Sequence, residues 1–445
     1  MTTVGSSVSQ CHSMPGTGNF FTRSKCVSIR SRLGIAFAAT AIIGVGYALP
    51  ASAQTAACQG APHISKQIAK PMKAAQDAMT AKKWQESLAK MKEAEAVAFS
   101  RTAFDNFTIA QFRAYIYSST RQEADAAREL ETQLASPCLP AAKKADTLRN
   151  LVGLYTGLKN YPKAIDYGNK ALAISKDTET QVYVAQAYYQ SGNAKESARI
   201  INDLLADMEK GGRKPTEQNL LLARAACERA GDNNCVSKIF EKLVIYYPKP
   251  DYWANLMKAL RATDVDDRQA LNVMRLALHV NVLKDKDQFK EFAQLSLEEQ
   301  LGCEAQTVLE QGFAKKVFVE ERDISVNKRL LAAAQAQVVT EKADLAKNEA
   351  AAKSAATGDA LVKVGAQNLT CGDAAKGTEL IQAGITKGGL AKGDPKEAER
   401  NDEAYMLLGI SYLKSNNKAD AAKAFRAVKR DPTMVRIAKL WLLNT

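Results

Sequence analysis

Cysteine is the residue type in this chain whose number and spacing point most directly to a chemistry. The sequence has eight cysteines, and the six beyond residue 53 are Cys58, Cys138, Cys227, Cys235, Cys303 and Cys371. An even number in an oxidising compartment indicates disulfides. We expect Cys227–Cys235 first, because these residues would lie on the two helices of one hairpin, across its turn. Chain order alone pairs Cys58 with Cys138 and Cys303 with Cys371, and buried free thiols are the alternative.

Groups that could act in catalysis are sparse. Two histidines, His63 and His279, lie beyond residue 53 and are far apart in the sequence. His279 follows an apolar run, and we interpret it as a helix-end residue rather than a base. The chain has no nucleophile elbow, zinc-protease motif or phosphate-binding glycine motif, and no Cys/His cluster with metal-ligand spacing. We therefore expect no catalytic residue, no metal and no cofactor, with an enzyme of unrecognised site as the least favoured alternative.

The first 53 residues differ in kind from the rest. They carry four basic residues between positions 23 and 32, no acidic residue, and an apolar stretch over 33–49 that ends before Ala51-Ser52-Ala53. These three regions predict a secretory signal peptide over 1–53. The apolar stretch is shorter than a membrane span requires. A retained anchor and a mitochondrial transit peptide are the alternatives, and Met1 and Met14 are both candidate start residues.

The charge of the remaining chain is compatible with acidic partners. The whole sequence has a net charge of +13, and removal of the four basic leader residues leaves a moderate positive excess. Nucleic acid is a poor candidate, because export separates the chain from it and no aromatic-interleaved basic motif is present. No later segment is apolar enough to span a bilayer.

Residues 401–432 give the clearest pattern for the helices that would position a binding site. Tyr405, Leu408 and Tyr412 share one helical face with Gly409, and a polar turn then leads to a second helix. On that helix Ala421 and Phe425 face the first helix. The small residues Gly409 and Ala421 allow the two helices to approach closely, and the large side chains fill the remaining space. This segment resembles the tetratricopeptide (TPR) repeat, whose pattern is W-x2-L-G-x2-Y, then A-x3-F, then P.

Weaker versions of the same unit recur along the chain. The spacings from Tyr155 to Tyr188 and from Cys227 to Leu260 are both close to the ~34 residues of a TPR period. The resemblance covers about residues 68–320 and 358–435. It implies a right-handed all-α solenoid, with about seven hairpins over 54–320 and further hairpins over 358–445.

Residues 321–357 interrupt the repeats with a run rich in Ala, Lys, Glu and Gln. Four apolar residues are spaced seven apart, and the positions that would complete a heptad seam are mostly polar: Ile324, Leu331, Val338 and Leu345, then Asn327, Ala334, Glu341 and Asn348. A self-sufficient coiled coil is thus disfavoured. We expect one long helix that lays a thin apolar stripe on the solenoid. A protruding arm is the alternative.

The TPR resemblance implies a binding surface, because first helices of successive repeats line a concave groove in that family. Carried onto this chain, the groove offers Arg149, Gln186, Tyr189, Gln190, Arg229, Lys258 and Arg261. We expect an exported, periplasmic scaffold that binds a protein or an extended, acidic peptide there. The alternative is a structural envelope component that acts through the long helix and the convex face. The sequence does not specify the oligomeric state.

Overall fold

The described part of the chain is entirely helical. The computed structural model describes residue 58, residues 63–262 and residues 265–445, so the predicted signal peptide lies outside the described residues. Within these ranges there are twenty α-helices and no strand, and all belong to one compact unit, Ser52–Thr445. The prediction of an all-α fold is confirmed.

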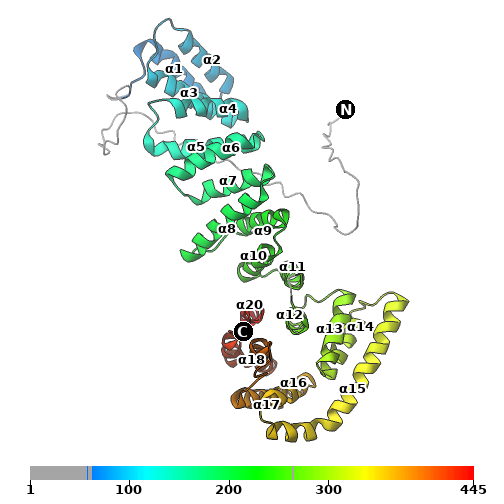
Figure 1. Ribbon diagram of the computed structural model, residues 1–445. Helices are drawn as coiled ribbons and strands as arrows, with labels where there is room; N and C mark the ends of the chain where they lie inside the picture. Colours follow the sequence, from blue (N-terminus) through cyan, green and yellow to red (C-terminus); the bar gives the residue numbers. More distant parts are fainter. Residues whose placement is uncertain (1–57, 59–62, 263–264) are drawn as a thin grey trace. The chain divides into compact units, whose positions relative to one another are not determined.

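The first fourteen helices form seven consecutive hairpins, in which each helix packs on the next (Figure 1). Their bounds are α1 (Lys66–Thr80), α2 (Trp84–Ala96), α3 (Ala103–Ser119), α4 (Glu123–Ala135), α5 (Ala141–Gly157), α6 (Tyr161–Ile174), α7 (Thr178–Gln190), α8 (Ala194–Lys210), α9 (Glu217–Ala230), α10 (Asn233–Tyr246), α11 (Pro250–Arg261), α12 (Asp267–His279), α13 (Lys286–Glu298) and α14 (Gly302–Ala314). The odd-numbered helices are the first helices of their hairpins.

A single long helix follows the seven hairpins and precedes the last ones. The remaining elements are α15 (Glu321–Ser354), α16 (Asp359–Thr370), α17 (Ala374–Lys387), α18 (Glu397–Lys414), α19 (Lys418–Ala427), α20 (Pro432–Trp441) and a short 3-10 helix, Leu442–Asn444. Helices α16 and α17, and α18 and α19, pack as two further hairpins. The chain therefore has helical hairpins on both sides of α15.

Five of the nine hairpins in the described residues share one type of turn. A residue in the left-handed region is followed at once by an Asn or Asp whose side chain accepts the backbone N–H three residues later. The pairs are Lys159-Asn160, Gly192-Asn193, Gly231-Asp232, Gly372-Asp373 and Asn416-Asn417. The left-handed residue ends the first helix, and the Asn or Asp caps the second. Short polar turns thus set the helices antiparallel.

The predicted contact between small and large residues in the final repeat is present. A Cβ placed on Gly409 would lie only 2.5 Å from Phe425 Cε1, so glycine alone allows α18 and α19 to approach this closely. Ala421 and Phe425 are both buried, and the Phe425 ring stacks on Trp441 with centroids 5.6 Å apart. The last repeat therefore extends its core into α20.

Helices α12–α20 make a closed circuit of contacts, which no sequence pattern predicted. Each packs on the next, and α20 returns to pack on α12 (Figure 1). Polar contacts join α12 to both α18 and α20: Arg268 pairs with Glu403 of α18, and Gln269 donates to Asp431, the N-cap of α20, at 3.3 Å. Arg436 of α20 also pairs with Glu241 of α10.

The long helix α15 packs along α13, α14 and α16 instead of projecting as an arm. Its buried positions include Asn327, Ala334, Val338 and Glu341, three of which belong to the seam that the sequence marks as mostly polar. The predicted apolar positions Ile324, Leu331 and Leu345 are only half-buried. The packed face of α15 therefore combines small, polar and charged residues with the apolar Val338.

The three cysteine pairs expected from the sequence all lie at disulfide distance. The Cα atoms are 5.5 Å apart in Cys58–Cys138, 5.7 Å in Cys227–Cys235 and 5.0 Å in Cys303–Cys371. The first pair joins residue 58 to the segment before α5, and the second lies across the α9–α10 turn. The third joins the start of α14 to the end of α16, across the inserted α15.

Candidate functional site

The first helices of the middle hairpins form a continuous face. Helix α7 contacts both α5 and α9, so the residues that these helices direct outward share one surface. The predicted groove residues lie on it with different exposure. Gln190, Arg229 and Lys258 are exposed, whereas Arg149, Gln186, Tyr189 and Arg261 are half-buried.

Arg149 is bound to acidic neighbours. It lies on α5 and its guanidinium is 2.9 Å from Asp146, 3.6 Å from Asp177 and 3.4 Å from Glu179. The last two residues are the N-cap and first turn of α7. The pKa of Asp177 is lowered, because hydrogen bonds from Thr180 and the charge of Arg149 outweigh desolvation. Arg149 therefore ties α5 to α7, and its charge is compensated within the chain.

Arg261 has the same role between α11 and α13, where it pairs with Glu291. Between α9 and α11, Glu217 accepts from Tyr252 and Lys249. These contacts form a ladder of polar links between successive first helices. Two of the seven predicted groove residues, Arg149 and Arg261, are thus used to hold neighbouring repeats together.

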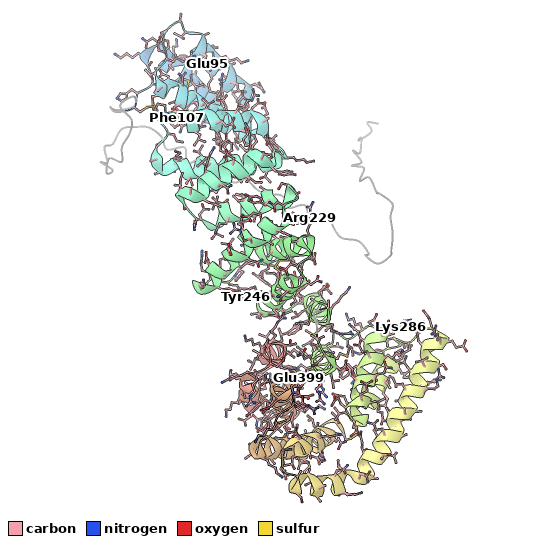
Figure 2. The ribbon with its side chains drawn as sticks, viewed as in Figure 1. Glu95, Phe107, Arg229, Tyr246, Lys286 and Glu399 are labelled. Atoms are coloured by element: carbon pink, nitrogen blue, oxygen red, sulfur yellow. A yellow bond between two sulfur atoms is a disulfide. The ribbon has the colours of Figure 1, made fainter. Side chains whose placement is uncertain are left out.

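Arg229 and Tyr189 come together at the centre of this face. Arg229 on α9 donates from Nη1 to the carbonyl oxygen of Tyr189 on α7 at 3.0 Å. Its guanidinium carbon lies 5.2 Å from the centroid of the Tyr189 ring. Figure 2 labels Arg229 on this stretch. Within the described residues Arg229 has no acidic partner, so a stacked cation is presented to solvent.

Lys258 is on the next first helix, α11, and is exposed. No acidic side chain among the described residues pairs with it. Arg229 and Lys258 are therefore the two predicted groove cations whose charge remains uncompensated inside the described ranges. The neighbouring Gln186 and Gln190 add amide groups, which can both donate and accept hydrogen bonds.

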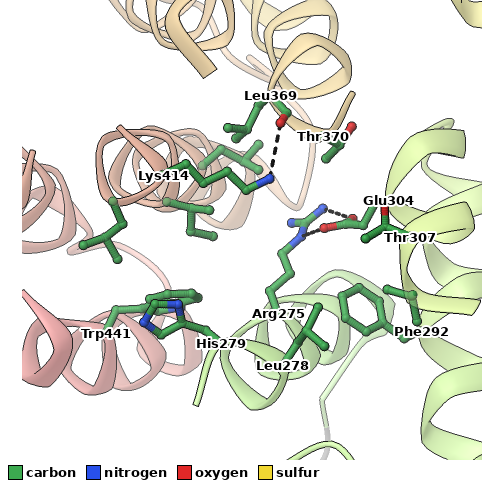
Figure 3. Close-up of a pocket in the computed structure, with 14 residues that line it drawn as sticks. Arg275, Leu278, His279, Phe292, Glu304, Thr307, Leu369, Thr370, Lys414 and Trp441 are labelled. Atoms are coloured by element: carbon green, nitrogen blue, oxygen red, sulfur yellow. Dashed lines mark hydrogen bonds and ion pairs between the residues drawn. The ribbon is translucent and has the colours of Figure 1, made fainter. Parts of the chain in front are cut away.

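A pocket of about 250 Å³ lies inside the circuit α12–α20, and the sequence reasoning missed it (Figure 3). Side chains from α12, α13, α14, α16, α18 and α20 line it. Most are apolar, including Phe292, Leu413 and Trp441. The polar ones include Arg275, Glu304 and Lys414, which are far apart in the sequence.

Arg275 is buried in the wall of this pocket and fully paired. Its Nε and Nη2 donate to the two oxygens of Glu304 at 2.9 Å and 2.8 Å. Burial by itself would lower the pKa of Arg275, but the charge of Glu304 raises it above its usual value. The pair is a two-bond fork, the strongest geometry for these groups. Arg275 therefore remains a cation, and Glu304 already has its partner.

Lys414 faces the same pocket with a single hydrogen bond. Its Nζ donates to the carbonyl oxygen of Leu369, at the end of α16, at 3.3 Å (Figure 3). The side chain is accessible from the pocket, and the protein around it lowers the pKa of Lys414 through desolvation. The nearby charge of Arg275 acts in the same direction, and that of Glu304 opposes it.

His279 also borders this pocket, where its ring lies 4.7 Å from that of Trp441. It is exposed in the last turn of α12, which agrees with its interpretation as a helix-end residue. A second pocket of about 540 Å³ shares Arg275 and Leu407 with the first. Its charged residues include Arg268 and Glu299, which pair with each other.

Across residue 58 and residues 63–262 and 265–445, no group of three or more His, Cys, Asp or Glu side chains is arranged to hold a metal ion. None of the described helices combines the length and the apolar character that a bilayer crossing demands.

Comparison with known proteins finds similarity to solved structures only. It matches no protein-family model and no curated protein sequence. A solved tetratricopeptide repeat protein from Parabacteroides merdae is similar over 61% of this chain and 100% of its own, with 14% identity and a TM-score of 0.33. The TPR2AB domain of yeast Sti1 in complex with pHSP90 is similar over 68% and 98%, with 14% identity and a TM-score of 0.25. Naa15/Naa10 bound to HypK-THB is similar over 86% and 61%, with 15% identity and a TM-score of 0.28.

The hairpins themselves define the class. Seven consecutive antiparallel helix pairs, each packed on the next, and contacts of α7 with α5 and α9 make this chain a TPR-like helical repeat array. The repeat resemblance expected from residues 401–432 is therefore confirmed as a description of the fold.

Proposed function

We propose that this protein is an exported TPR-like scaffold that binds an extended, acidic segment of a protein partner along its first-helix face. The observation that carries this proposal is the Arg229–Tyr189 stack on α7 and α9, followed by the exposed Lys258 on α11. These groups offer two uncompensated cations and an aromatic surface on neighbouring first helices. A repeat array whose turns lie at its edges leaves such a face open for a ligand.

The chemistry of the face favours carboxylates. An arginine stacked on a tyrosine has lost conformational freedom before any ligand arrives, and its remaining N–H groups point toward solvent. A partner carboxylate then gains charge-assisted hydrogen bonds at little ordering cost. Because Arg149 and Arg261 are already paired with acids, we place the centre of recognition on α7, α9 and α11.

Export has separate support. Three cysteine pairs lie at disulfide distance in the described residues, and two of them connect positions that are 80 and 68 residues apart. Such a set suits an oxidising compartment, where disulfides persist. Together with the leader sequence, this supports a periplasmic location for the mature chain.

The binding proposal is tested with a synthetic glutamate-rich peptide and a lysine-rich peptide of equal length, each followed by fluorescence anisotropy. We expect the wild-type chain to bind only the acidic peptide. The double variant Arg229→Glu/Lys258→Glu should bind it at least about tenfold more weakly, because each lost charge-assisted contact contributes about 1 kcal/mol or more.

The matched control reverses two exposed lysines on second helices, Lys195 on α8 and Lys238 on α10. Lys195→Glu/Lys238→Glu changes the net charge equally and should keep the affinity. Equal weakening in both double variants would mean nonspecific attraction to a basic chain and would overturn the proposal, as would no binding of the acidic peptide. Export is tested independently, by N-terminal sequencing of the protein from a periplasmic fraction, where Gln54 is the expected first residue.

A further inference from the structure

The pocket inside the circuit α12–α20 has a surplus of hydrogen-bond donors. Trp441, which lines it, is 2% exposed, and its indole N–H has no hydrogen-bond partner. Lys414 carries three N–H donors and uses one, toward the Leu369 carbonyl. Lys414 therefore has two N–H donors free for a ligand, whereas the Trp441 nitrogen is buried and does not open into the pocket.

The pocket's own acceptors are already engaged. Glu304 accepts two hydrogen bonds from Arg275 and a third, at 3.3 Å, from the Ser296 hydroxyl. The hydroxyls of Thr307 and Thr370 donate to carbonyls of their own helices, which leaves only their oxygen lone pairs toward the pocket. Glu304 therefore acts on Lys414 through its charge alone, because its oxygens accept from Arg275 and Lys414 donates to the Leu369 carbonyl.

An ammonium group in this setting favours an anionic ligand. Lys414 is exposed, so an anion that enters the pocket can reach its ammonium and accept charge-assisted hydrogen bonds from its free N–H groups. Arg275 is a second positively charged residue that lines the same pocket. Arg275 is neutralised by Glu304 and also lies 3.8 Å from Glu403, so Lys414 is the cation of this pocket that has no carboxylate hydrogen-bonded to it.

The apolar walls and the volume of the pocket determine the remaining chemistry and the size of the ligand. Phe292, Leu413 and Trp441 are among eight apolar side chains that line the pocket, against six polar or charged ones. Its volume of about 250 Å³ corresponds to roughly eight liquid waters. That space suits one small molecule and excludes a folded segment.

We propose that this pocket binds a small amphipathic monocarboxylate, with the carboxylate on Lys414 and the apolar chain against Phe292, Leu413 and Trp441. Figure 3 shows the Lys414 amine and the Arg275–Glu304 pair at the centre, with Trp441 and Phe292 on either side. None of the residues that line this pocket belongs to the Tyr189, Arg229 and Lys258 face. A failure of peptide binding at that face would therefore leave the carboxylate proposal intact, and the reverse also holds.

Three probes of equal chain length isolate the charge: octanoate, octan-1-ol and octylamine, titrated calorimetrically into the full chain. We expect saturable binding of octanoate, binding of octan-1-ol weaker by about tenfold or more, and no binding of the octylammonium ion. Equal affinity for octanoate and octan-1-ol, or no saturable binding of octanoate, would overturn the proposal.

The variant series assigns the carboxylate contact to Lys414. Lys414→Met keeps the length and removes the charge, so octanoate affinity should fall to that of octan-1-ol. Lys414→Arg should preserve the preference for octanoate, which covers the case in which the methionine variant unfolds. The matched control is Lys418→Met, at an exposed position on α19, and it should change neither affinity. Retention of the octanoate preference in a folded Lys414→Met chain would exclude Lys414 as the carboxylate-binding group.

Discussion

Glu341 on α15 accepts the backbone N–H of Gly302, the first residue of α14, with both carboxylate oxygens 3.1 Å from that nitrogen. The N-cap residue of α14 is Leu301, whose side chain cannot cap the helix. A negative charge from another helix therefore satisfies the positive end of α14. Gln337 donates to the same carboxylate at 2.7 Å, which fixes its orientation. This contact anchors the long helix at a defined register.

Removal of that carboxylate should destabilise the protein. Glu341→Ala leaves the Gly302 N–H without its partner, and we expect a loss of about 2 kcal/mol in the free energy of unfolding. Urea denaturation followed by circular dichroism measures it. Asp344→Ala removes an exposed acid from the same helix and should change stability by less than about 0.5 kcal/mol. Equal losses in both variants would contradict a specific role for Glu341.

Gly409 should not tolerate even one added methyl group. In Gly409→Ala the new Cβ meets the Phe425 ring, and the overpacking cost of about 1–3 kcal/mol exceeds the gain in helix propensity, about 1 kcal/mol. We expect a lower melting temperature. Gly157→Ala, in an exposed helix end where the Cβ meets only the flexible Glu123 carboxylate, should instead be neutral or stabilising.

Shortening the partner ring tests the cause of that loss. In a Phe425→Leu background, Gly409→Ala should cost less than it does in the wild type, so the two changes are coupled. Additive effects in this double-mutant cycle would mean that the glycine is needed for another reason.

The cysteine pairs should contribute unequally to stability. The positions of Cys303 and Cys371 are 68 residues apart, and those of Cys227 and Cys235 are 8 apart. In the chain-entropy model the longer loop contributes about 4.5 kcal/mol and the shorter about 2.5 kcal/mol. We therefore expect Cys303→Ser/Cys371→Ser to lower the melting temperature more than Cys227→Ser/Cys235→Ser. Thiol labelling of the unreduced wild-type chain that begins at Gln54 should find no reactive cysteine, and stoichiometric labelling would contradict the pairing.

Glu399 should make the protein less stable as the pH rises. Burial raises the pKa of Glu399 to about 8, and its hydrogen bond to Asp266 adds to this effect. The folded chain thus retains a proton that the unfolded chain releases near pH 4.5, so the free energy of unfolding falls between about pH 4.5 and 8. Glu399→Gln keeps a donor toward Asp266 without a titrating proton. We expect this variant to match the wild type at pH 5 and to be about 1–3 kcal/mol more stable at pH 8.

Thermal melts of both proteins at several pH values measure the difference. Other titrating groups are common to the two chains, and Asp266 itself changes protonation only near its lowered pKa of about 2. A constant difference between pH 5 and 8 would contradict the assignment.

Local patterns in the sequence were sufficient to predict the hairpins. Gly409 and Phe425 are close in the chain, and their sizes alone indicate a tight helix crossing, which the structure contains. The same holds for Asn160, Asn193, Asp232, Asp373 and Asn417, because a cap acts within a few residues. Helical periodicity and turn chemistry are local, so both can be read without knowledge of the tertiary fold.

Contacts between distant segments could not be predicted in this way. Arg268 and Glu403 are separated by 135 positions, and nothing in either neighbourhood marks the other as its partner. Glu341 was grouped with the polar positions of a heptad seam, although its charge is buried because it meets a helix end. The pocket was missed for the same reason, since Arg275 and Lys414 come from separate hairpins. Arg149 and Arg261 lie on the predicted face, but their acidic neighbours were not identified from the sequence.

The return of α20 to α12 changes how the second half of the molecule can come apart. A row of stacked repeats frays from its free ends, one unit after another, because each unit is held only by its neighbours. In a closed circuit of helices, where α20 packs on α12, neither the first nor the last helix is held by one neighbour alone. Local unfolding of one helix in the circuit must disrupt two helix–helix interfaces at once. We therefore expect the amide hydrogens of helices α12–α20 to exchange as one cooperative unit.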